Sequence, residues 1–295
     1  MVPFHIQPES DQRILCFHIT QECDCDTIFA FYHLSKKMRY RYYQQGCVYT
    51  KNKRLTQNHS LRCGEQLFIA PIHEEEEIIP WAKPIEICYE DDCFLVVNKP
   101  VGMLVHSDGN NQNHTLHNCV KAYYQAHALD VAVRSVHRLD LDTSGLVLYI
   151  KHPFFQAYMD HLIAEKDIQR CYFAWVKGRI AQTSLIIDQP LGRDRHHAGR
   201  MRIHTKGKAA CTKVKVKKRL RDATLVECQL LSGRTHQIRV HLASIGHPLL
   251  SDALYGTKDS RIHRCALHAW KLEFYHPLKQ AKQTICCPLP EDMDI

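Results

Sequence analysis

The chain has 295 residues, of which 45% are hydrophobic and 24% are charged, so a disordered or fibrous architecture is excluded and a globular protein is expected. Its formal net charge of +8 at pH 7 favours a polyanionic partner. The amino terminus lacks the pattern of a secretion signal and no apolar run approaches a membrane span, so we expect a cytoplasmic protein without a membrane contact.

The first predicted unit lies at residues 27–70 and contains two helices followed by short strands. Ser35 is a typical N-cap for the second helix, which ends at Gly46. That helix mixes basic and aromatic residues, namely Lys36, Lys37, Arg39 and Arg41 with Tyr40, Tyr42 and Tyr43. Cations interleaved with aromatic rings suit phosphate contacts and base stacking in RNA, whereas a solvated helix face is the alternative interpretation.

The composition changes after this unit. An acidic run at residues 74–77 and the proline-bounded sequence PWAKP are typical of a linker. We therefore expect a small α+β domain at residues 1–78, a linker at residues 79–88 and a large domain at residues 89–295.

Strands and helices alternate through the large domain. Strands are expected at residues 94–98 and 145–150, and the second run is apolar at almost every position, as in a strand buried on both faces. Helices are expected at residues 115–129 and along the apolar stripe of Phe155, Tyr158 and Leu162. A further strand is expected at residues 170–176.

Three lysines form a row on a later predicted strand. Lys213, Lys215 and Lys217 alternate with two valines, so a strand here has one apolar face and one positive face. The pattern predicts an RNA-facing ridge, and a solvated edge strand protected by lysines is the alternative interpretation.

The loop before the strand at residues 145–150 is rich in polar side chains. These are His137, Arg138, Asp140, Asp142, Thr143 and Ser144. Polar residues beside a buried strand are costly unless they pair with each other or with a ligand. The loop is therefore predicted to be functional.

A second polar segment, at residues 230–250, has the pattern of a strand, a tight turn and a helix that ends at Gly246. Arg239 lies beside the buried stripe of this helix, where its charge needs an acidic partner, and we expect that partner to be Asp140. A carboxylate beside a guanidinium stays ionised and can act as a nucleophile or base, while a purely structural ion pair is the alternative.

Residue spacing disfavours other kinds of site. His236 and His241 do not share a helical face and the cysteine pairs lack the gap of a zinc knuckle, so no metal is expected. No glycine-rich phosphate loop is present, so no nucleotide cofactor is expected. Asp140 and Asp142 are too close in sequence to flank one bond from opposite sides, as a glycosidase pair does.

The motifs of both polar segments resemble those of the RluA-type family of RNA pseudouridine synthases. HRLD at residues 137–140, followed by DTSG at residues 142–145, resembles the family signature, and VVNKPVGMLVH at residues 96–106 resembles its opening strand and turn. GRTHQIRVHLASIGHPLLSDALYG at residues 233–256 resembles its closing segment, with Ser251 where the family often has glycine. The first unit is similar to the small RNA-binding domain that many bacterial members carry.

The resemblance implies a pseudouridine synthase fold of the α+β class, with a mixed, largely antiparallel central sheet flanked by helices and loops. It also implies that Asp140 is the catalytic aspartate, that Arg239 is its ion-pair partner, and that Tyr172 stacks on the target base and helps to move its proton. Arg138 is expected either to help flip the uridine out of its stack or to contact phosphate.

The implied substrate is structured RNA, with large-subunit ribosomal RNA as the first expectation and transfer RNA as the alternative. Isomerisation of uridine needs no redox cofactor or energy donor, so no cofactor is expected. The aspartate has three possible routes: attack on the sugar, attack on the uracil ring, or removal of a sugar proton. A non-catalytic ribosome-assembly factor on the same fold is the competing interpretation, and a monomer is the default expectation.

Overall fold

The computed structural model describes residues 2–9, 13–109, 113–197 and 199–295. The N-terminal unit folds around an antiparallel sheet of order β1-β2-β7-β4-β5. Its strands are β1 (Phe4–Glu9), β2 (Ile14–Ile19), β4 (Val48–Thr50), β5 (Lys53–Arg54) and β7 (Gln66–Ile69), beside the ribbon of β3 (Cys23–Asp24) and β6 (Ser60–Leu61). Its helices are α1 (Cys25–Phe31) and α2 (Lys36–Gln44).

The helices of this unit begin at capping residues. The Asp24 side chain accepts a hydrogen bond from Thr27 N, and Ser35 accepts one from Met38 N, so each cap satisfies a backbone donor that the first turn leaves unpaired. Gly46 follows α2 with φ of +68°, a left-handed conformation that glycine adopts without strain. The predicted start and end of the basic helix are thus confirmed.

The large sheet has the strand order β13-β16-β17-β12-β18-β11-β9-β8, with β10 added on β11 and β19 on β18. Among its described pairs, β11 and β18 run parallel and the others are antiparallel, which confirms the expected mixed, largely antiparallel sheet. Its strands are β8 (Glu86–Glu90), β9 (Phe94–Lys99), β10 (Arg134–Ser135), β11 (Ser144–Ile150), β12 (Gln169–Lys177), β13 (Ser184–Asp188), β16 (Cys211–Arg219), β17 (Ala223–Leu230), β18 (Leu267–His276) and β19 (Ala281–Cys286).

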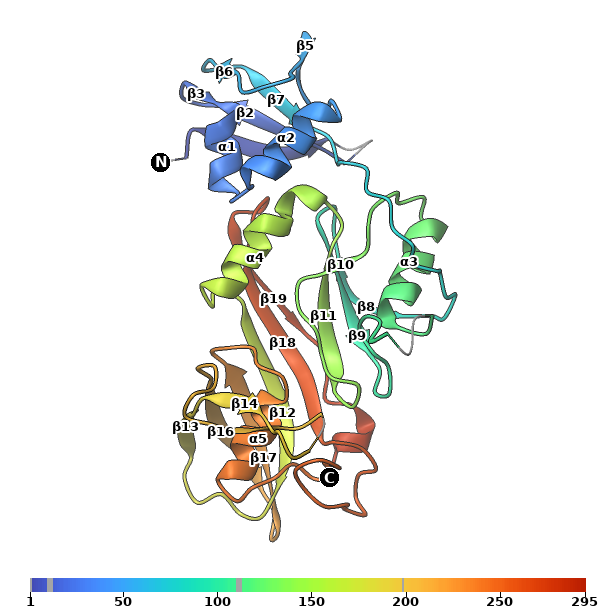
Figure 1. The fold of residues 1–295 in the computed structure, drawn as a ribbon, viewed down its shortest axis with the longest axis vertical. Helices are drawn as coiled ribbons and strands as arrows, with labels where there is room; N and C mark the ends of the chain where they lie inside the picture. The colour runs from blue at the N-terminus through green and yellow to red at the C-terminus, as the bar shows by residue number, and fades with distance from the viewer. Residues whose placement is uncertain (1, 10–12, 110–112, 198) are drawn as a thin grey trace.

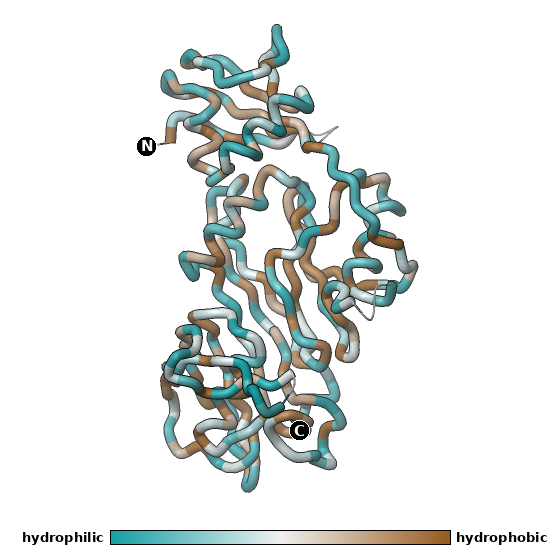
Figure 2. The backbone as a smooth tube through the Cα atoms, in the orientation of Figure 1, coloured by the Kyte–Doolittle hydropathy of each residue, from teal (hydrophilic) through white to brown (hydrophobic). Residues whose placement is uncertain are grey.

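Helices and a small ribbon flank this sheet (Figure 1). They are α3 (Leu116–Ala126), η1 (Pro153–Phe155), α4 (Gln156–Ala164), α5 (Gln237–Ser244), η2 (Glu291–Met293), and the ribbon of β14 (Leu191–Arg193) with β15 (Met201–Ile203). Every residue of β11 is buried, as its apolar sequence predicts, and Figure 2 shows hydrophobic stretches along the central strands. None of the described helices combines the length and apolar composition that a bilayer span requires.

The core continues from the N-terminal unit into the large sheet. Figure 1 shows the N-terminal unit at one end of the molecule, next to α4. The ring of Phe154, in η1, lies 5.7 Å from that of Phe17 and 5.1 Å from that of Tyr32. The division at residue 78 stays a prediction, and the expected linker at residues 79–88 overlaps β8, which begins at Glu86.

The structure changes the interpretation of the basic helix α2. Tyr42 and Tyr43 are buried in the core, so neither offers a face for base stacking, whereas Tyr40 is 65% exposed. Arg39 pairs with Asp26 at 3.2 Å and Arg41 with Glu74 at 3.0 Å. The aromatic residues are interleaved in sequence because α2 buries one face, and that face carries two of the three tyrosines.

Candidate active site

The loop between β10 and β11 holds Asp140 in a turn. Thr143 N donates to Asp140 O at 3.1 Å, and the next carbonyl, Leu141 O, accepts from Gly102 N at 2.9 Å. The fully buried Lys99 ammonium donates to Leu141 O at 3.3 Å and to Met103 O at 2.7 Å. Burial lowers the pKa of Lys99 to about 7. The turn at residues 98–103 therefore anchors the Asp140 loop through two donors.

A glycine fixes the position of this loop against the sheet. Gly145 has φ of +114°, and a Cβ built on it would lie 2.3 Å from the carbonyl oxygen of Ala269. Gly145 pairs with Ala269 where β11 runs parallel to β18. Only glycine allows the backbones of β11 and β18 to come this close. The loop that carries Asp140 therefore joins the sheet at the contact between Gly145 and Ala269.

Tyr172 lies on β12 and faces the same pocket as Asp140. The register between β12 and β18 shifts between Cys171 and Tyr172, because Trp270 of β18 has no partner on β12 there; β12 itself pairs with β17 without a break. Tyr172 is 5% exposed, and burial raises its pKa to about 12. Its phenol is therefore protonated at neutral pH and can donate a hydrogen bond.

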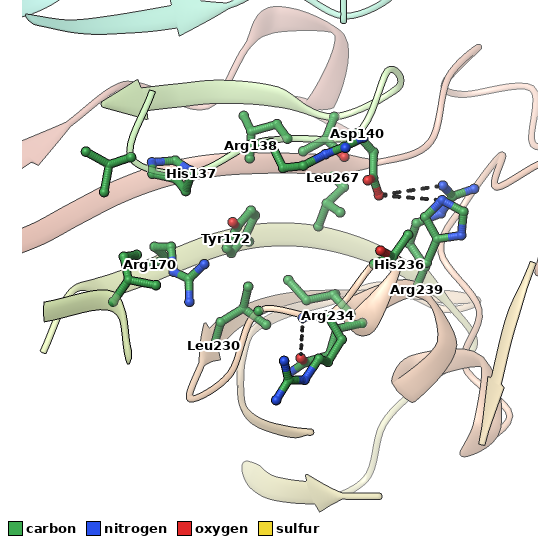
Figure 3. Close-up of a pocket in the computed structure, with 18 residues that line it drawn as sticks. His137, Arg138, Asp140, Arg170, Tyr172, Leu230, Arg234, His236, Arg239 and Leu267 are labelled. Carbon is green, nitrogen blue, oxygen red and sulfur yellow. Dashed lines mark hydrogen bonds and ion pairs between the residues drawn. The ribbon is translucent and has the colours of Figure 1, made fainter. Parts of the chain in front are cut away.

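Arg239, on α5, lies between two carboxylates, of which Figure 3 shows Asp140. Its Nη1 is 3.9 Å from Asp140 Oδ2, while its Nε and Nη2 donate to both oxygens of Asp252 at 2.8 and 2.6 Å. Asp252 is fully buried and also accepts from the backbone N–H of Leu254 and Tyr255. Although burial opposes ionisation, the Arg239 hydrogen bonds hold the pKa of Asp252 below its usual value. The structure thus brings Asp140 and Arg239 together, but Asp252 makes the closer contact with Arg239.

His236 is the second group beside Asp140, with its Nε2 3.9 Å from Asp140 Oδ2. It precedes α5 in a left-handed conformation, with φ of 54°, and its Nδ1 lies 2.9 Å from the Tyr255 hydroxyl. Burial lowers the pKa of His236, so the ring is neutral at neutral pH. The Asp140 side chain remains 23% exposed, which leaves it accessible from the pocket.

The pocket around these residues has a volume of about 270 Å³ and a positive lining. The guanidinium groups of Arg138, Arg170, Arg234 and Arg239 line it, and Asp140 is the carboxylate among the lining residues. This charge pattern suits an anionic ligand. In the part of the chain that the structure describes, no cluster of three or more His, Cys, Asp or Glu could hold a metal ion.

The predicted lysine row lies away from this pocket. Val214 pairs with Cys228, which pairs with Tyr172, so these three side chains share one face of the sheet. Lys213 and Lys215 are exposed on the opposite face, and Lys217 pairs with Glu227 at 3.3 Å. Lys36, Lys37, Arg39 and Arg41 belong to the N-terminal unit and do not line the pocket either. Any RNA contact of these residues is therefore separate from that of the pocket, and it stays a prediction.

Five residues of the site described above were not predicted from the sequence: Lys99, Arg170, Arg234, His236 and Asp252. One of them could have been predicted from the alternation of side chains along a β-strand. Arg170 precedes Tyr172 by two positions and therefore lies on the same face of the strand. Asp252 follows α5 in an irregular loop, where side chains do not repeat in direction, so the sequence gives no basis for predicting its contact with Arg239. Ser251, beside it, has φ of 53°, a left-handed conformation that accounts for the glycine expected at this position.

Comparisons with known proteins agree with this geometry. A family model described as RNA pseudouridylate synthase matches residues 93–244. The chain is 40% identical over 243 residues to an uncharacterized RNA pseudouridine synthase of Bacillus subtilis, YhcT, covering 80% of this chain and 79% of the relative. It is 35% identical over 261 residues to ribosomal large subunit pseudouridine synthase D of Nitrosomonas europaea, covering 85% and 76% respectively. The solved structure of human RNA pseudouridylate synthase domain containing 1 aligns with a TM-score of 0.60 and 26% identity, covering 72% of this chain and 88% of that one.

Proposed function

Because this chain belongs to the RNA pseudouridylate synthase family and is an RNA pseudouridine synthase of the RluA type, we propose that it isomerises uridines of large-subunit ribosomal RNA, with Asp140 as the catalytic carboxylate. The ribosomal target is supported by the names of relatives such as the Nitrosomonas europaea enzyme. The observation that carries the assignment of Asp140 is its position as the one carboxylate among the described residues that line a pocket with four guanidinium groups.

The pocket residues divide the work of the reaction. The target uridine leaves its stack and enters the pocket, where the Tyr172 ring replaces the lost stacking. Asp140 then faces the sugar and the glycosidic bond, which must break before the base turns and rejoins through carbon. Attack on the sugar, attack on the uracil ring and removal of a sugar proton all remain compatible with this placement.

Arg239 and Tyr172 assist in different ways. Arg239, held by Asp252, presents one guanidinium nitrogen to Asp140 and so keeps a positive charge beside the reacting carboxylate. Tyr172 stacks on the base and helps to move its proton: because its pKa is raised to about 12, its hydroxyl is protonated at neutral pH and accepts the proton of the base only as it gives up its own. Arg138 also lines the pocket, with its Nη1 3.2 Å from His106 Nε2. It helps the target uridine to leave its stack in the RNA.

The ribosomal target is tested with RNA labelled with tritium at carbon 5 of uracil. The purified protein is incubated separately with ribosomal RNA and transfer RNA from cells that lack its gene, because those RNAs have unmodified target sites. Label should enter water from the large-subunit ribosomal fraction, and the released amount should match the pseudouridines that sequencing finds missing in those cells. Release from the transfer RNA fraction alone would contradict the ribosomal target, and binding without any release would favour an assembly factor.

A further inference from the structure

Arg170 occupies the end of the pocket away from Asp140. Figure 3 shows Asp140 directed toward His236 and Arg239 at one end, Arg170 and His137 at the other, and Tyr172 between them. Arg170 and Tyr172 are alternate residues of β12 and therefore project from the same face. A nucleotide that reaches Asp140 and stacks on Tyr172 thus lies next to Arg170.

The charge of Arg170 has no counter-ion among the described residues. Its Nε is buried without a hydrogen-bond partner, and no ion pair links its guanidinium to a carboxylate. By contrast, Arg239, Arg261 and Arg264 each pair with a carboxylate at 2.6–2.7 Å. A partly buried guanidinium without a counter-ion and with a buried Nε that donates to nothing is costly for the folded protein, so its position in a pocket points to a ligand that supplies the missing charge.

The neighbours of Arg170 do not supply this charge. His137 is neutral, because burial, together with the positive charge of Arg170, lowers its pKa to about 3. The guanidinium lies against Gly233, where an added Cβ would be 2.8 Å from Nη1 and 3.2 Å from Nη2. Gly233 has no positive φ that would require glycine, so the missing side chain leaves space for the guanidinium.

We infer that Arg170 is a phosphate-binding residue, and that its guanidinium donates hydrogen bonds to the two non-bridging oxygens of one phosphate in the RNA strand that carries the target uridine. The inference rests on the proposed function only in that a uridine nucleotide enters this pocket. A planar guanidinium matches two phosphate oxygens, and a phosphate carries the full negative charge that this end of the pocket lacks. A uracil carbonyl could accept a hydrogen bond but is neutral and would leave the charge unbalanced.

The direct test compares uridine with uridine 3′,5′-bisphosphate as probes, each titrated into the full-length protein and followed by NMR. The unmutated protein should bind the bisphosphate more tightly. Arg170→Gln should reduce that preference by roughly tenfold or more and leave uridine affinity unchanged. Arg221→Gln, which removes one exposed positive charge in the turn after β16, is the control and should change neither affinity.

Three results would overturn the inference: an equal affinity of the unmutated protein for both probes, a preference retained in full by Arg170→Gln, or an equal loss of uridine and bisphosphate binding.

Gly233→Ala provides a second variant, because its methyl group displaces the Arg170 guanidinium while the positive charge remains. It should also reduce the preference for the bisphosphate. These titrations need no ribosomal substrate. If no tritium were released from ribosomal RNA, the proposed target would be wrong, but the result of the titrations with uridine and its bisphosphate would still stand.

Salt dependence separates a phosphate contact from a structural role. For an RNA that the protein binds, the slope of log affinity against log salt concentration should fall in magnitude by about 0.7 in Arg170→Gln, as expected for one contact to a single strand. Arg170→Lys should retain the slope, because the charge stays. A slope unchanged in Arg170→Gln would show that Arg170 contacts no phosphate.

Discussion

At the scale of single residues, Arg239 contacts two carboxylates that differ in burial and in distance. Asp252 is fully buried and bidentate, whereas Asp140 is 23% exposed and 3.9 Å away. The short hydrogen bonds from Arg239 to Asp252 fix the guanidinium. Asp140 therefore has a positive charge nearby, but its oxygens are not engaged in a close salt bridge. This arrangement leaves the carboxylate available to a substrate.

The role of Asp252 leads to a prediction about stability. Asp252→Asn keeps the size of the side chain but leaves the buried charge of Arg239 without its close partner, so we expect a loss of about 3 kcal/mol in the free energy of unfolding and a severe loss of turnover. Urea denaturation and tritium release measure the two effects. Asp259→Asn is the control: it breaks the partly exposed pair with Arg261 and should cost less than about 1 kcal/mol. Equal stabilities of the two variants would contradict the role given to Asp252.

The sequence predicted Asp140 and Arg239 as neighbours, because a charge at the edge of a helical stripe needs a partner. It did not predict Asp252, since a loop has no period from which a contact can be inferred. The same limit applies to Lys99, whose ammonium is satisfied by backbone carbonyls that a sequence does not place.

At the scale of elements, the parallel pairing of β11 with β18 depends on Gly145. In Gly145→Ala the methyl group would meet Ala269 O and the residue would keep a positive φ, so we expect a loss of several kcal/mol in the free energy of unfolding and a displaced Asp140 loop. Gly64→Ala is the matched control, because Gly64 has φ of +88° but no atom within 4 Å of an added Cβ. It should cost only about 1 kcal/mol. A similar cost for both variants in urea denaturation would contradict the close approach.

The lysine row shows what a strand pattern can and cannot predict. Alternation correctly placed Lys213 and Lys215 on an exposed face of β16 and Val214 on a buried one. It could not predict which face carries the active site, because that depends on the register through β17 to Tyr172. Alternation in sequence therefore identified the positive face but not its position relative to Asp140.

At the scale of the whole molecule, Phe154 connects the N-terminal unit to the large sheet. Its ring packs against both Phe17 and Tyr32, so Phe154→Ala should lower the free energy of unfolding by about 3–5 kcal/mol and increase proteolytic cleavage at residues 79–84, most of which are already exposed. Phe31→Ala, at a side chain that is 44% exposed, is the control and should cost much less. Urea denaturation and limited proteolysis measure both effects. A stable, protease-resistant Phe154→Ala would show that the shared core is dispensable.

Stability should also fall in mild acid, because several buried histidines are neutral in the folded protein. Burial lowers the pKa of His117 and His268 to about 4 and that of His137 and His152 to about 3. The unfolded chain binds protons on these rings below about pH 6.5, whereas the folded protein does not until about pH 4. Their contribution is therefore fully present above pH 6.5 and is lost as the pH falls.

Each of these histidines contributes a slope of about 1.4 kcal/mol per pH unit within that window, so the four together give about 5 kcal/mol per unit near pH 5. Urea denaturation at several pH values measures the slope directly. Unfolding free energies that stay constant between pH 6.5 and 5 would contradict the neutral, buried state of these rings.

The assignment of Asp140 is tested most directly by single-turnover release of tritium from uracil carbon 5, with the enzyme in excess and RNA affinity measured in parallel. Asp140→Asn should slow release on the order of 10³-fold or more while RNA affinity stays within about twofold, whereas Asp142→Asn, in the same loop, should retain most of the rate. Release by Asp140→Asn at a rate close to that of the unmutated protein would contradict the account.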